Sequence, residues 1–246
     1  MAPLVERPLS LAVRTLRVLA EIPGYLRAWY RYRRLPAAEP LQLRDADPRL
    51  SDRLPATPFD PHYLYQAIWA AERIFANAPS EHVDVGSQLM FVTVLAAKLS
   101  VVFVDIRPMQ LDVANLRPMA GDILDLPFSD RSIASLSCLH VVEHIGLGRY
   151  GDTLNPSGTR QALAELERVL APGGDLFLSL PVGRPRVCFN AHRIHDPREI
   201  VEMLRGLELV EFSAVDDAGR IQAGESVEDA ARFRYGCGLF WFRGRR

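Results

Sequence analysis

Two histidines and a glutamate that lie close together in the sequence offer the most direct chemistry in this chain. His140, Glu143 and His144 occur at and just after the end of an apolar run, 133–142, that is typical of a buried strand. A histidine titrates near neutral pH, so it can remove a proton from an oxygen or nitrogen nucleophile. We expect His144 to be such a general base and Glu143 to orient it. In the alternative, Glu143 and His144 only hold the following loop through hydrogen bonds to the backbone.

Two acids occupy the ends of two predicted strands earlier in the chain. The stretch 81–106 indicates a strand, a tight turn at Gly86, a helix over 89–99 and a second strand. Asp84 ends the first strand, and Asp105 ends the second. Asp105 follows the turn by about 20 residues, the spacing at which an acid reaches a ribose diol. The unit therefore predicts a nucleoside-containing ligand, whereas the alternative for both acids is to cap a neighbouring turn or helix.

Polar side chains in two later loops are candidates for binding a substrate. Both loops follow strands and by topology face the same crevice as the acids. The candidates are Arg149, Tyr150, Asp152, Asn190, His192 and Arg193. The two arginines favour a phosphate or carboxylate, as in a sugar nucleotide or a phosphorylated glycan, and an Arg149–Asp152 pair that orders its own loop is the alternative. His192 and His195 have no third ligand nearby, so we expect no metal site there.

Helical and strand patterns alternate along the chain from residue 61 onwards. Helices are predicted over 61–75, 89–99, 160–170 and 197–205, and strands over 82–85, 101–106, 120–123, 133–142, 175–183, 207–215 and 233–244. The segments 189–197 and 216–231 are predicted loops, and APGG at 171–174 is expected to end the helix before it. This order predicts a doubly wound α/β domain with an antiparallel pair at its end.

The first part of the chain differs in charge from the rest. Residues 1–44 contain eight arginines and three glutamates, a net charge of 8 − 3 = +5, although the whole chain carries −1. A helical pattern covers 8–22, and we expect Pro23-Gly24 to break it. Aromatics and arginines then alternate over 25–35. We divide the chain into a basic amphipathic arm (1–35), a proline-rich linker (36–60) and an α/β domain (61–246).

The arm is open to more than one interpretation. Aromatics beside arginines suit an anionic membrane surface, which residues 7–35 would contact from the inner face of the cell membrane. The alternative is a helical arm that packs on its own domain or on a partner subunit. No other stretch forms a basic track, so we expect no nucleic-acid partner.

The composition is that of a globular protein with an ordinary core, at 48% hydrophobic residues. No run of 18 apolar residues occurs, which argues against a membrane-spanning helix. The N-terminus lacks a secretory pattern. The three cysteines are far apart and odd in number, which argues against both a disulfide framework and a zinc site and fits a reducing cytoplasm.

Several motifs in this order resemble those of Rossmann-like S-adenosylmethionine-dependent methyltransferases. DVG (84–86) and VVFVDI (101–106) resemble the first two motifs of that superfamily. GDILDLPFSD (121–130) and LERVLAPGGDLFLSLP (166–181) resemble two later ones. A closer likeness to one family is carried by five segments: HYLYQAIWAAERI, EHVDVGS, VDIRP, SCLHVVEHIGLGRYGDTLNPSGT and FNAHRI. Together they resemble a bacterial family of uncharacterised methyltransferase-like proteins that carries a domain-of-unknown-function label.

The resemblance implies a seven-stranded sheet with one antiparallel strand, S-adenosylmethionine as cofactor, and roles for matching residues. Asp84 and the Gly86-Ser87 turn would lie near the methionine end of the cofactor. Asp105 would bind the ribose, Ile106 would flank the adenine, and Asp122 with the Ile123 backbone would meet the adenine amine. His140 would lie where the fourth strand opens onto the reacting methyl group. For Asp122, a plain Gly-Asp turn is the alternative.

Two positions depart from the superfamily pattern. Gly86 is followed by Ser87-Gln88-Leu89 in place of further glycines, and Ala134 replaces an acid near the start of the fourth strand. A nicotinamide enzyme needs three glycines to seat a pyrophosphate, so the turn favours a methyltransferase over a dehydrogenase. We therefore expect methyl transfer to an oxygen or nitrogen of a small polar or glycan-linked acceptor. The alternative is a non-catalytic, methyltransferase-like interaction module at the membrane surface.

Overall fold

The computed structural model describes residues 11–107 and 109–246, and these form two separate compact units. The smaller unit lies within 4–59 and the larger covers Asp60–Arg246. Residues 1–10, where the predicted arm begins, lie outside the described residues. Among the described residues, no helix is both long enough and apolar enough to cross a membrane.

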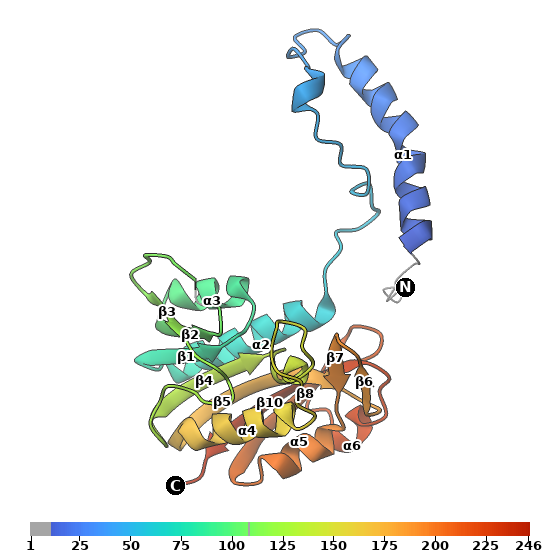
Figure 1. The fold of residues 1–246 in the computed structure, drawn as a ribbon. Helices are drawn as coiled ribbons and strands as arrows, with labels where there is room; N and C mark the ends of the chain where they lie inside the picture. Colours follow the sequence, from blue (N-terminus) through green and yellow to red (C-terminus); the bar gives the residue numbers. More distant parts are fainter. Residues whose placement is uncertain (1–10, 108) are drawn as a thin grey trace. The chain divides into compact units, whose positions relative to one another are not determined.

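The smaller unit consists of the helix α1 (Leu11–Tyr32), the 3-10 turn η1 (Leu43–Asp45) and extended chain (Figure 1). The predicted helix break at Pro23-Gly24 is wrong, because α1 continues through both residues. A proline inside a helix removes only one backbone hydrogen bond, and the flanking sequence favours helix on both sides. Aromatic and basic side chains meet at the end of α1, where the Arg34 guanidinium lies 3.8 Å from the Tyr30 ring centre.

The larger unit is built on one sheet with the strand order β3-β2-β1-β4-β5-β10-β8-β9. Its strands are β1 (Glu81–Val85), β2 (Ser100–Asp105), β3 (Leu116–Ala120), β4 (Ile133–Leu139), β5 (Leu170–Val182), β8 (Leu207–Val215), β9 (Ile221–Ala223) and β10 (Gly236–Gly244). The first five in spatial order are parallel, and β10 runs antiparallel between β5 and β8. This confirms the predicted Rossmann-like methyltransferase fold, to which the short strand β9 adds an antiparallel edge.

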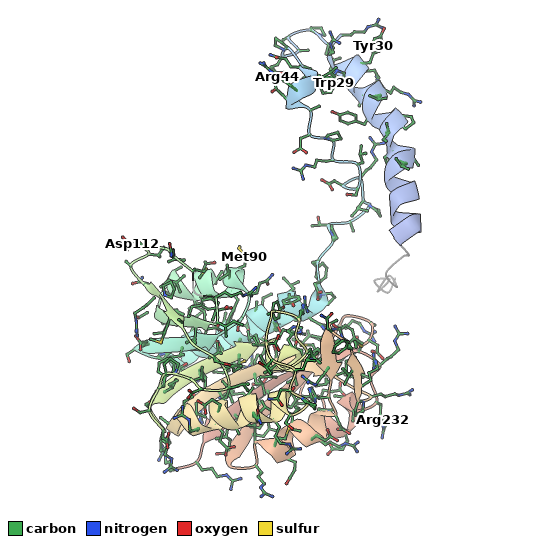
Figure 2. All side chains as sticks on the ribbon, in the orientation of Figure 1. Trp29, Tyr30, Arg44, Met90, Asp112 and Arg232 are labelled. Atoms are coloured by element: carbon green, nitrogen blue, oxygen red, sulfur yellow. The ribbon has the colours of Figure 1, made fainter. Side chains whose placement is uncertain are left out.

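Helices cover both faces of the sheet (Figure 1). They are α2 (Pro61–Asn77), α3 (Leu89–Ala96), α4 (Gly158–Val169), α5 (Pro197–Met203) and the short α6 (Val227–Ala230). Strand β2 shows why two layers form, since its side chains alternate between faces. Val101 and Phe103 pack with α2 and α3, and Val102 and Val104 belong to the core under α4 and α5. The outer side of α3 is solvated, and Met90 on it is 70% exposed (Figure 2).

The ends of α2 and α5 follow the local chemistry of their sequences. In each helix a proline occupies the first turn and an aspartate caps it, Asp60 for α2 and Asp196 for α5. Trp69 and Arg73 then fasten α2 to β8, because both donate hydrogen bonds to the carboxylate of Glu211. Trp69 belongs to the core, since it is 3% exposed.

Four sequence predictions about elements need correction. The strand predicted at 120–123 lies earlier, as β3, and Gly121-Asp122 belongs to the turn after it. The predicted loop 189–197 contains β7 (His192–Ile194), which pairs with β6 (Arg186–Cys188). The predicted loop 216–231 contains β9 and α6. Residues 171–174 do not end α4, which stops at Val169, but form the irregular start of β5.

Candidate functional site

The order of the strands reverses between β1 and β4, and the carboxyl ends of β1, β2 and β4 meet at one edge of the sheet. Ligands of doubly wound sheets bind at such a reversal. Two adjoining hollows of about 110 and 370 Å³ open here, and both are lined by Gly86, Asp105 and Arg107. We call them together the cleft.

The turn after β1 is held from behind by a buried network. Asp84 is fully buried, and its Oδ1 accepts a hydrogen bond from Ser87 N at 3.0 Å while its Oδ2 accepts one from Ser137 Oγ. Burial raises the pKa of Asp84 to about 6, although these hydrogen bonds act in the opposite direction. Leu139 N donates to Ser87 Oγ at 2.9 Å, which joins the turn to β4. Asp84 therefore shapes the turn from beneath the cleft and does not line it.

Gly86 brings bare backbone to the wall of the cleft. Its φ is +68°, a conformation that side chains disfavour, and a Cβ placed on it would lie 3.2 Å from Val141 Cγ1. Ser87, the next residue, lines the larger hollow. Ser87 and Gln88 stand where the superfamily has further glycines, and they have different roles. Ser87 fixes the turn, and Gln88 is the N-cap residue of α3.

The end of β2 presents a carboxylate to the cleft. Asp105 Oδ1 accepts a hydrogen bond from Arg107 N at 2.7 Å, and the side chain is 20% exposed. Among the described residues, Oδ2 has no hydrogen-bond donor, so one oxygen remains for a ligand. Ile106 is 49% exposed beside it and adds an apolar surface.

The turn after β3 contributes one of its two predicted residues. Ile123 lines the cleft, together with Gly121. Asp122 is exposed and does not line it, because its Oδ1 accepts a hydrogen bond from Leu124 N at 2.9 Å and closes the turn. The alternative of a plain Gly-Asp turn therefore describes Asp122 better than a ligand contact.

His140 and Glu143 form a buried pair just beyond β4. His140 Nδ1 lies 2.7 Å from Glu143 Oε1, and Glu143 is fully buried. Burial alone lowers the pKa of His140, but Cys237 and Glu143 raise it well above its ordinary value. Burial likewise raises the pKa of Glu143, and the two histidines outweigh this and lower it. The pair is therefore a carboxylate with a histidine that donates from Nδ1, and His140 also lines the cleft.

His144 lines the cleft and is fixed by the backbone, not by Glu143. Its Nδ1 donates to the carbonyl oxygen of Ala191 at 2.6 Å, and Arg149 donates to the same oxygen at 3.1 Å. The expected orienting bond from Glu143 is absent among these residues, since Glu143 Oε1 lies 3.6 Å from His144 Nε2. The Glu143 carboxylate is therefore close to the His144 ring but does not form a hydrogen bond with it.

The loop after His144 assigns structural roles to two predicted substrate residues. Asp152 accepts hydrogen bonds from the backbone N–H groups of Gly146, Gly148 and Tyr150, which curls the loop around its carboxylate. Arg193 is 8% exposed and donates to the carbonyl oxygens of Ile145 and Asn155. The hydrogen bonds of Asp152 and Arg193 therefore go to backbone groups of the loop. The alternative Arg149–Asp152 pair is not formed.

The remaining substrate candidates differ in how they relate to the cleft. Tyr150 lines it, and the guanidinium groups of Arg107 and Arg149 lie 4.9 and 5.1 Å from its ring centre. Asn190 is exposed, and His192 is half-buried against the Tyr235 ring. Sequence reasoning missed Arg107 and Val141 as cleft residues. Arg107 could have been predicted, because it lies two residues after Asp105, the predicted ribose acid. Nothing in the sequence indicates that Val141 lies against Gly86.

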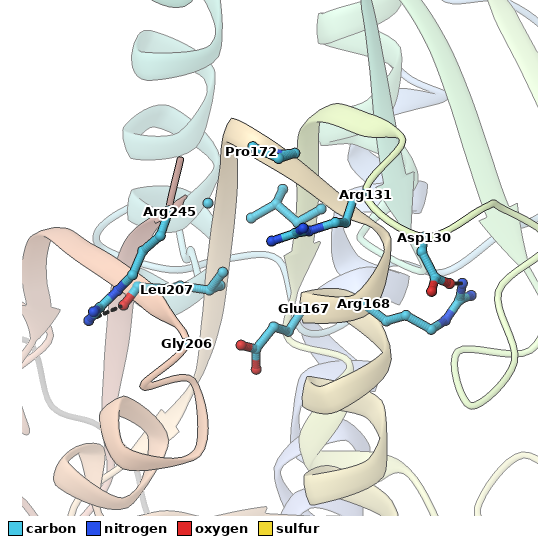
Figure 3. Close-up of a pocket in the computed structure, with 10 residues that line it drawn as sticks. Asp130, Arg131, Glu167, Arg168, Pro172, Gly206, Leu207 and Arg245 are labelled. Carbon is cyan, nitrogen blue, oxygen red and sulfur yellow. Dashed lines mark hydrogen bonds and ion pairs between the residues drawn. The ribbon is translucent and has the colours of Figure 1, made fainter.

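A third hollow, of about 280 Å³, lies at the opposite edge of the sheet, and Figure 3 shows its lining residues. It is lined by residues at the starts of β5 and β8, among them Leu170 and Leu207. Its Arg168 is already paired with Asp130 and Glu165. Because it lies at the starts of β5 and β8, the hollow shares no lining residue with the cleft at the carboxyl ends of the strands.

Solved structures with the same architecture include methyltransferases. NodS from Bradyrhizobium japonicum WM9, solved with S-adenosyl-L-homocysteine, is 19% identical with a TM-score of 0.52, over 79% of this chain and 91% of NodS. The [4+2]-cyclase SpnF is 17% identical with a TM-score of 0.53, over 74% of this chain and 80% of SpnF. YcgJ from Bacillus subtilis is 14% identical with a TM-score of 0.52, over 74% and 99%. The chain thus has a methyltransferase fold, and the cyclase shows that this fold alone does not define the reaction.

One family model also matches part of the chain. It covers residues 122–233 and is described as a Caenorhabditis protein of unknown function, DUF268. This match fits the expected domain-of-unknown-function label, and the bacterial family remains a prediction. No curated protein matches the sequence.

Proposed function

We propose that the protein transfers a methyl group from S-adenosylmethionine to an oxygen or nitrogen of a small polar or glycan-linked acceptor. One observation carries the proposal. A bare glycine turn (Gly86) and a strand-end carboxylate (Asp105) line the same cleft as His144 and Tyr150. A nucleoside-binding side and a polar, proton-accepting side are thus combined in one site.

The cleft residues fit the cofactor group by group. Gly86 would let the methionine part approach the backbone, because no side chain projects there. Asp105 would accept hydrogen bonds from the ribose diol through its free oxygen. Ile106 and Ile123 would supply apolar walls for the adenine ring. Asp84 and Ser87 would act indirectly by holding the turn.

When bound, S-adenosylmethionine supplies an electrophilic methyl group on a positively charged sulfur. The chain must then orient the acceptor and remove its proton. His144 is suited to this task, since a carbonyl oxygen only accepts hydrogen bonds and therefore fixes the proton of the neutral ring on Nδ1. Nε2 is left as the proton acceptor. The nearby carboxylate of Glu143 would stabilise the ring once it is protonated.

The cleft supports a polar or anionic acceptor. Tyr150 lies on its wall, with Arg107 and Arg149 against the ring. Arginines bind phosphate and carboxylate oxygens through paired N–H groups. Asn190 and His192 would contribute only if the acceptor extends toward the β6–β7 hairpin. Arg193 and Asp152 would contribute by holding the loop.

Methyl-labelled S-adenosylmethionine tests this function. The purified protein would be incubated with polar-metabolite, glycan, lipid and nucleic-acid fractions of a cell extract. We expect label in the polar or glycan fraction, and strongly reduced label at limiting cofactor when Asp105 is replaced by asparagine. Label confined to lipid or nucleic acid would contradict the acceptor class. Cofactor binding without label in any fraction would favour the non-catalytic module.

We further propose that the arm makes peripheral contact with a membrane at the cytoplasmic face. Leu19, Leu26 and Tyr30 are each more than half exposed on α1, whose other residues include Arg27 and Arg31. Exposed apolar and basic groups on one helix favour an anionic lipid surface. Flotation with anionic and neutral liposomes, with and without residues 1–35, tests this. Equal flotation of both proteins would refute it.

A further inference from the structure

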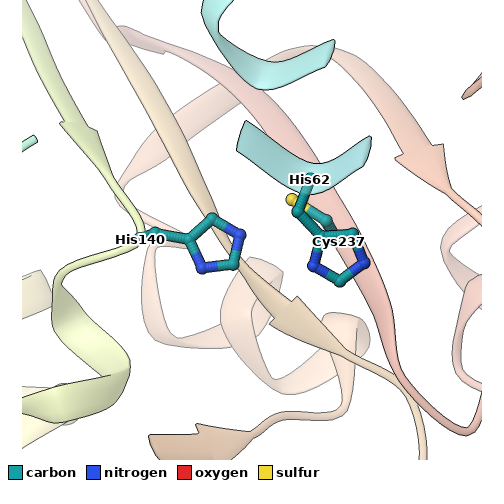
Figure 4. Close-up of side chains that lie close together, drawn as sticks. All are labelled: His62, His140 and Cys237. Carbon is teal, nitrogen blue, oxygen red and sulfur yellow. The ribbon is translucent and has the colours of Figure 1, made fainter. Parts of the chain in front are cut away.

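Three buried side chains from distant parts of the sequence meet beside the cleft. His62 lies in the first turn of α2, His140 follows β4, and Cys237 is the second residue of β10. Each offers one metal-ligating atom, and these atoms lie within 4.8 Å of one another (Figure 4). All three side chains are buried.

The ring of His140 is prepared for metal binding. Its Nδ1 faces Glu143 Oε1 at 2.7 Å, so the carboxylate holds a proton on Nδ1, and Nε2 is the atom that can ligate a metal once its own proton leaves. Nε2 is buried and has no hydrogen-bond partner among the described residues. The ring edge away from the backbone points toward His62 and Cys237 (Figure 4). A histidine that ligates a metal usually donates its other N–H to a carboxylate in this way.

The three elements hold their side chains in place. Cys237 is paired across the sheet with Pro181 of β5 and Val215 of β8, so the backbone around it is fixed on both sides. The Asp60 cap fixes the first turn of α2, since its Oδ1 accepts from His62 N at 2.9 Å. The centre of the His62 ring lies 5.6 Å from that of His140 and 5.0 Å from that of Tyr235, so both rings are close neighbours.

We propose that His62, His140 and Cys237 bind one zinc ion. Two imidazoles and a thiolate are a ligand set that zinc accepts, with bonds of about 2.0–2.3 Å. In tetrahedral coordination two such ligand atoms lie about 3.3–3.6 Å apart, so side-chain shifts of about 1 Å complete the site. Binding releases the thiol proton of Cys237 and the Nε2 proton of His140 to solvent and leaves both imidazoles neutral.

A zinc ion here has three protein ligands and a fourth position for water or a substrate oxygen. Such open coordination is typical of catalytic zinc, whereas structural sites are closed by four protein ligands. His140 also lines the cleft, so the ion lies next to the proposed methyl-transfer site. The site differs from the His192–His195 pair considered from the sequence, because its members come from α2, the residue after β4, and β10.

Zinc content of the full chain tests the proposal without S-adenosylmethionine or an acceptor. The protein would carry no polyhistidine tag, would be incubated with zinc sulfate and dialysed, and its metal would be measured by mass spectrometry. We expect about one zinc per chain. Cobalt(II) in place of zinc should give a thiolate-to-cobalt charge-transfer band. That spectrum needs no substitution, so it reports on a cysteine ligand even where a variant folds poorly.

Variants assign the ligands. Cys237→Ser and His62→Ala should each weaken zinc binding by at least about 100-fold, and Glu143→Gln by roughly 10- to 100-fold. Cys188→Ser is the matched control, since Cys188 lies on β6 outside the cluster, and it should keep full binding. Wild-type protein that retains no zinc, cobalt protein without the thiolate band, or equal binding by Cys237→Ser would each overturn the proposal. Because methyl-donor binding is not measured, failure here leaves the proposed function intact.

Discussion

Replacing Gly86 by alanine adds one methyl group to the turn after β1. The substitution has two effects that can be measured separately, a loss of stability from backbone strain and a loss of ligand affinity from the added side chain. The φ of +68° costs an L-residue about 1–2 kcal/mol. For a chain of this size, that lowers the unfolding midpoint by about 2–8 °C. The new Cβ also lies 3.2 Å from Val141 Cγ1 and enters the wall of the cleft. Overpacking of about 1–3 kcal/mol there lowers affinity for a ligand that touches this wall by roughly 5- to 150-fold.

Gly173→Ala is the matched control for this experiment. Gly173 has a φ of +74° and nothing within 4 Å of its added Cβ, and it lies at the start of β5, away from the cleft. Thermal unfolding and calorimetric titration with S-adenosylhomocysteine would be measured on both variants. We expect both to lose thermal stability, and only Gly86→Ala to lose affinity. Val141→Ala in the Gly86→Ala background should recover part of the affinity. Unchanged affinity in Gly86→Ala would refute the placement of the ligand against this turn.

Three further substitutions test separate parts of the structure. Arg193→Met removes two charge-assisted bonds to carbonyl oxygens and should cost roughly 3–6 kcal/mol in urea unfolding; full stability with weakened acceptor binding would restore a substrate role. His82 is bonded to Ser135 and Ser137, and burial lowers its pKa to about 3. In the unfolded chain His82 therefore binds a proton below about pH 6.5, whereas in the folded chain it stays neutral down to about pH 3. The free energy of unfolding falls as the pH drops through this range. Between pH 6.5 and 5, wild type should lose about 2 kcal/mol more than His82→Gln, and identical losses would contradict this. His144→Gln should lower methyl transfer by about 10²- to 10⁴-fold with little change in cofactor affinity, and unchanged turnover would exclude His144 as the base.

The fold was predictable because its signals are local. The β-branched runs ending at Val85, Asp105 and Val215 carry enough apolar surface to define strands without reference to partners. The three-residue strands β6, β7 and β9 have no such signal, since pairing with a distant segment creates them. Pro23 shows the opposite error, because a local breaker was outweighed by the helical preference around it.

The candidate site was predictable where function depends on short spacing. Gly86 and Asp105 belong to one βαβ unit, so the sequence alone relates them. The roles of Asp84, Glu143 and Arg193 were not accessible, because their partners Ser137, His140 and Ile145 are defined by burial and loop geometry. The same holds for His62 and Cys237, whose meeting with His140 depends on β10 lying beside β5.

Calorimetric titration of the full chain with S-adenosylhomocysteine tests the central claim most directly. We expect wild type to bind one molecule per chain. Asp105→Asn should weaken binding by roughly 10- to 100-fold, because it removes a charged acceptor worth about 1.5–3 kcal/mol and keeps the turn bond to Arg107 N. Asp122→Asn, a matched change on an exposed turn, should bind as wild type does. No binding by wild type, or equal binding by wild type and Asp105→Asn, would contradict the account.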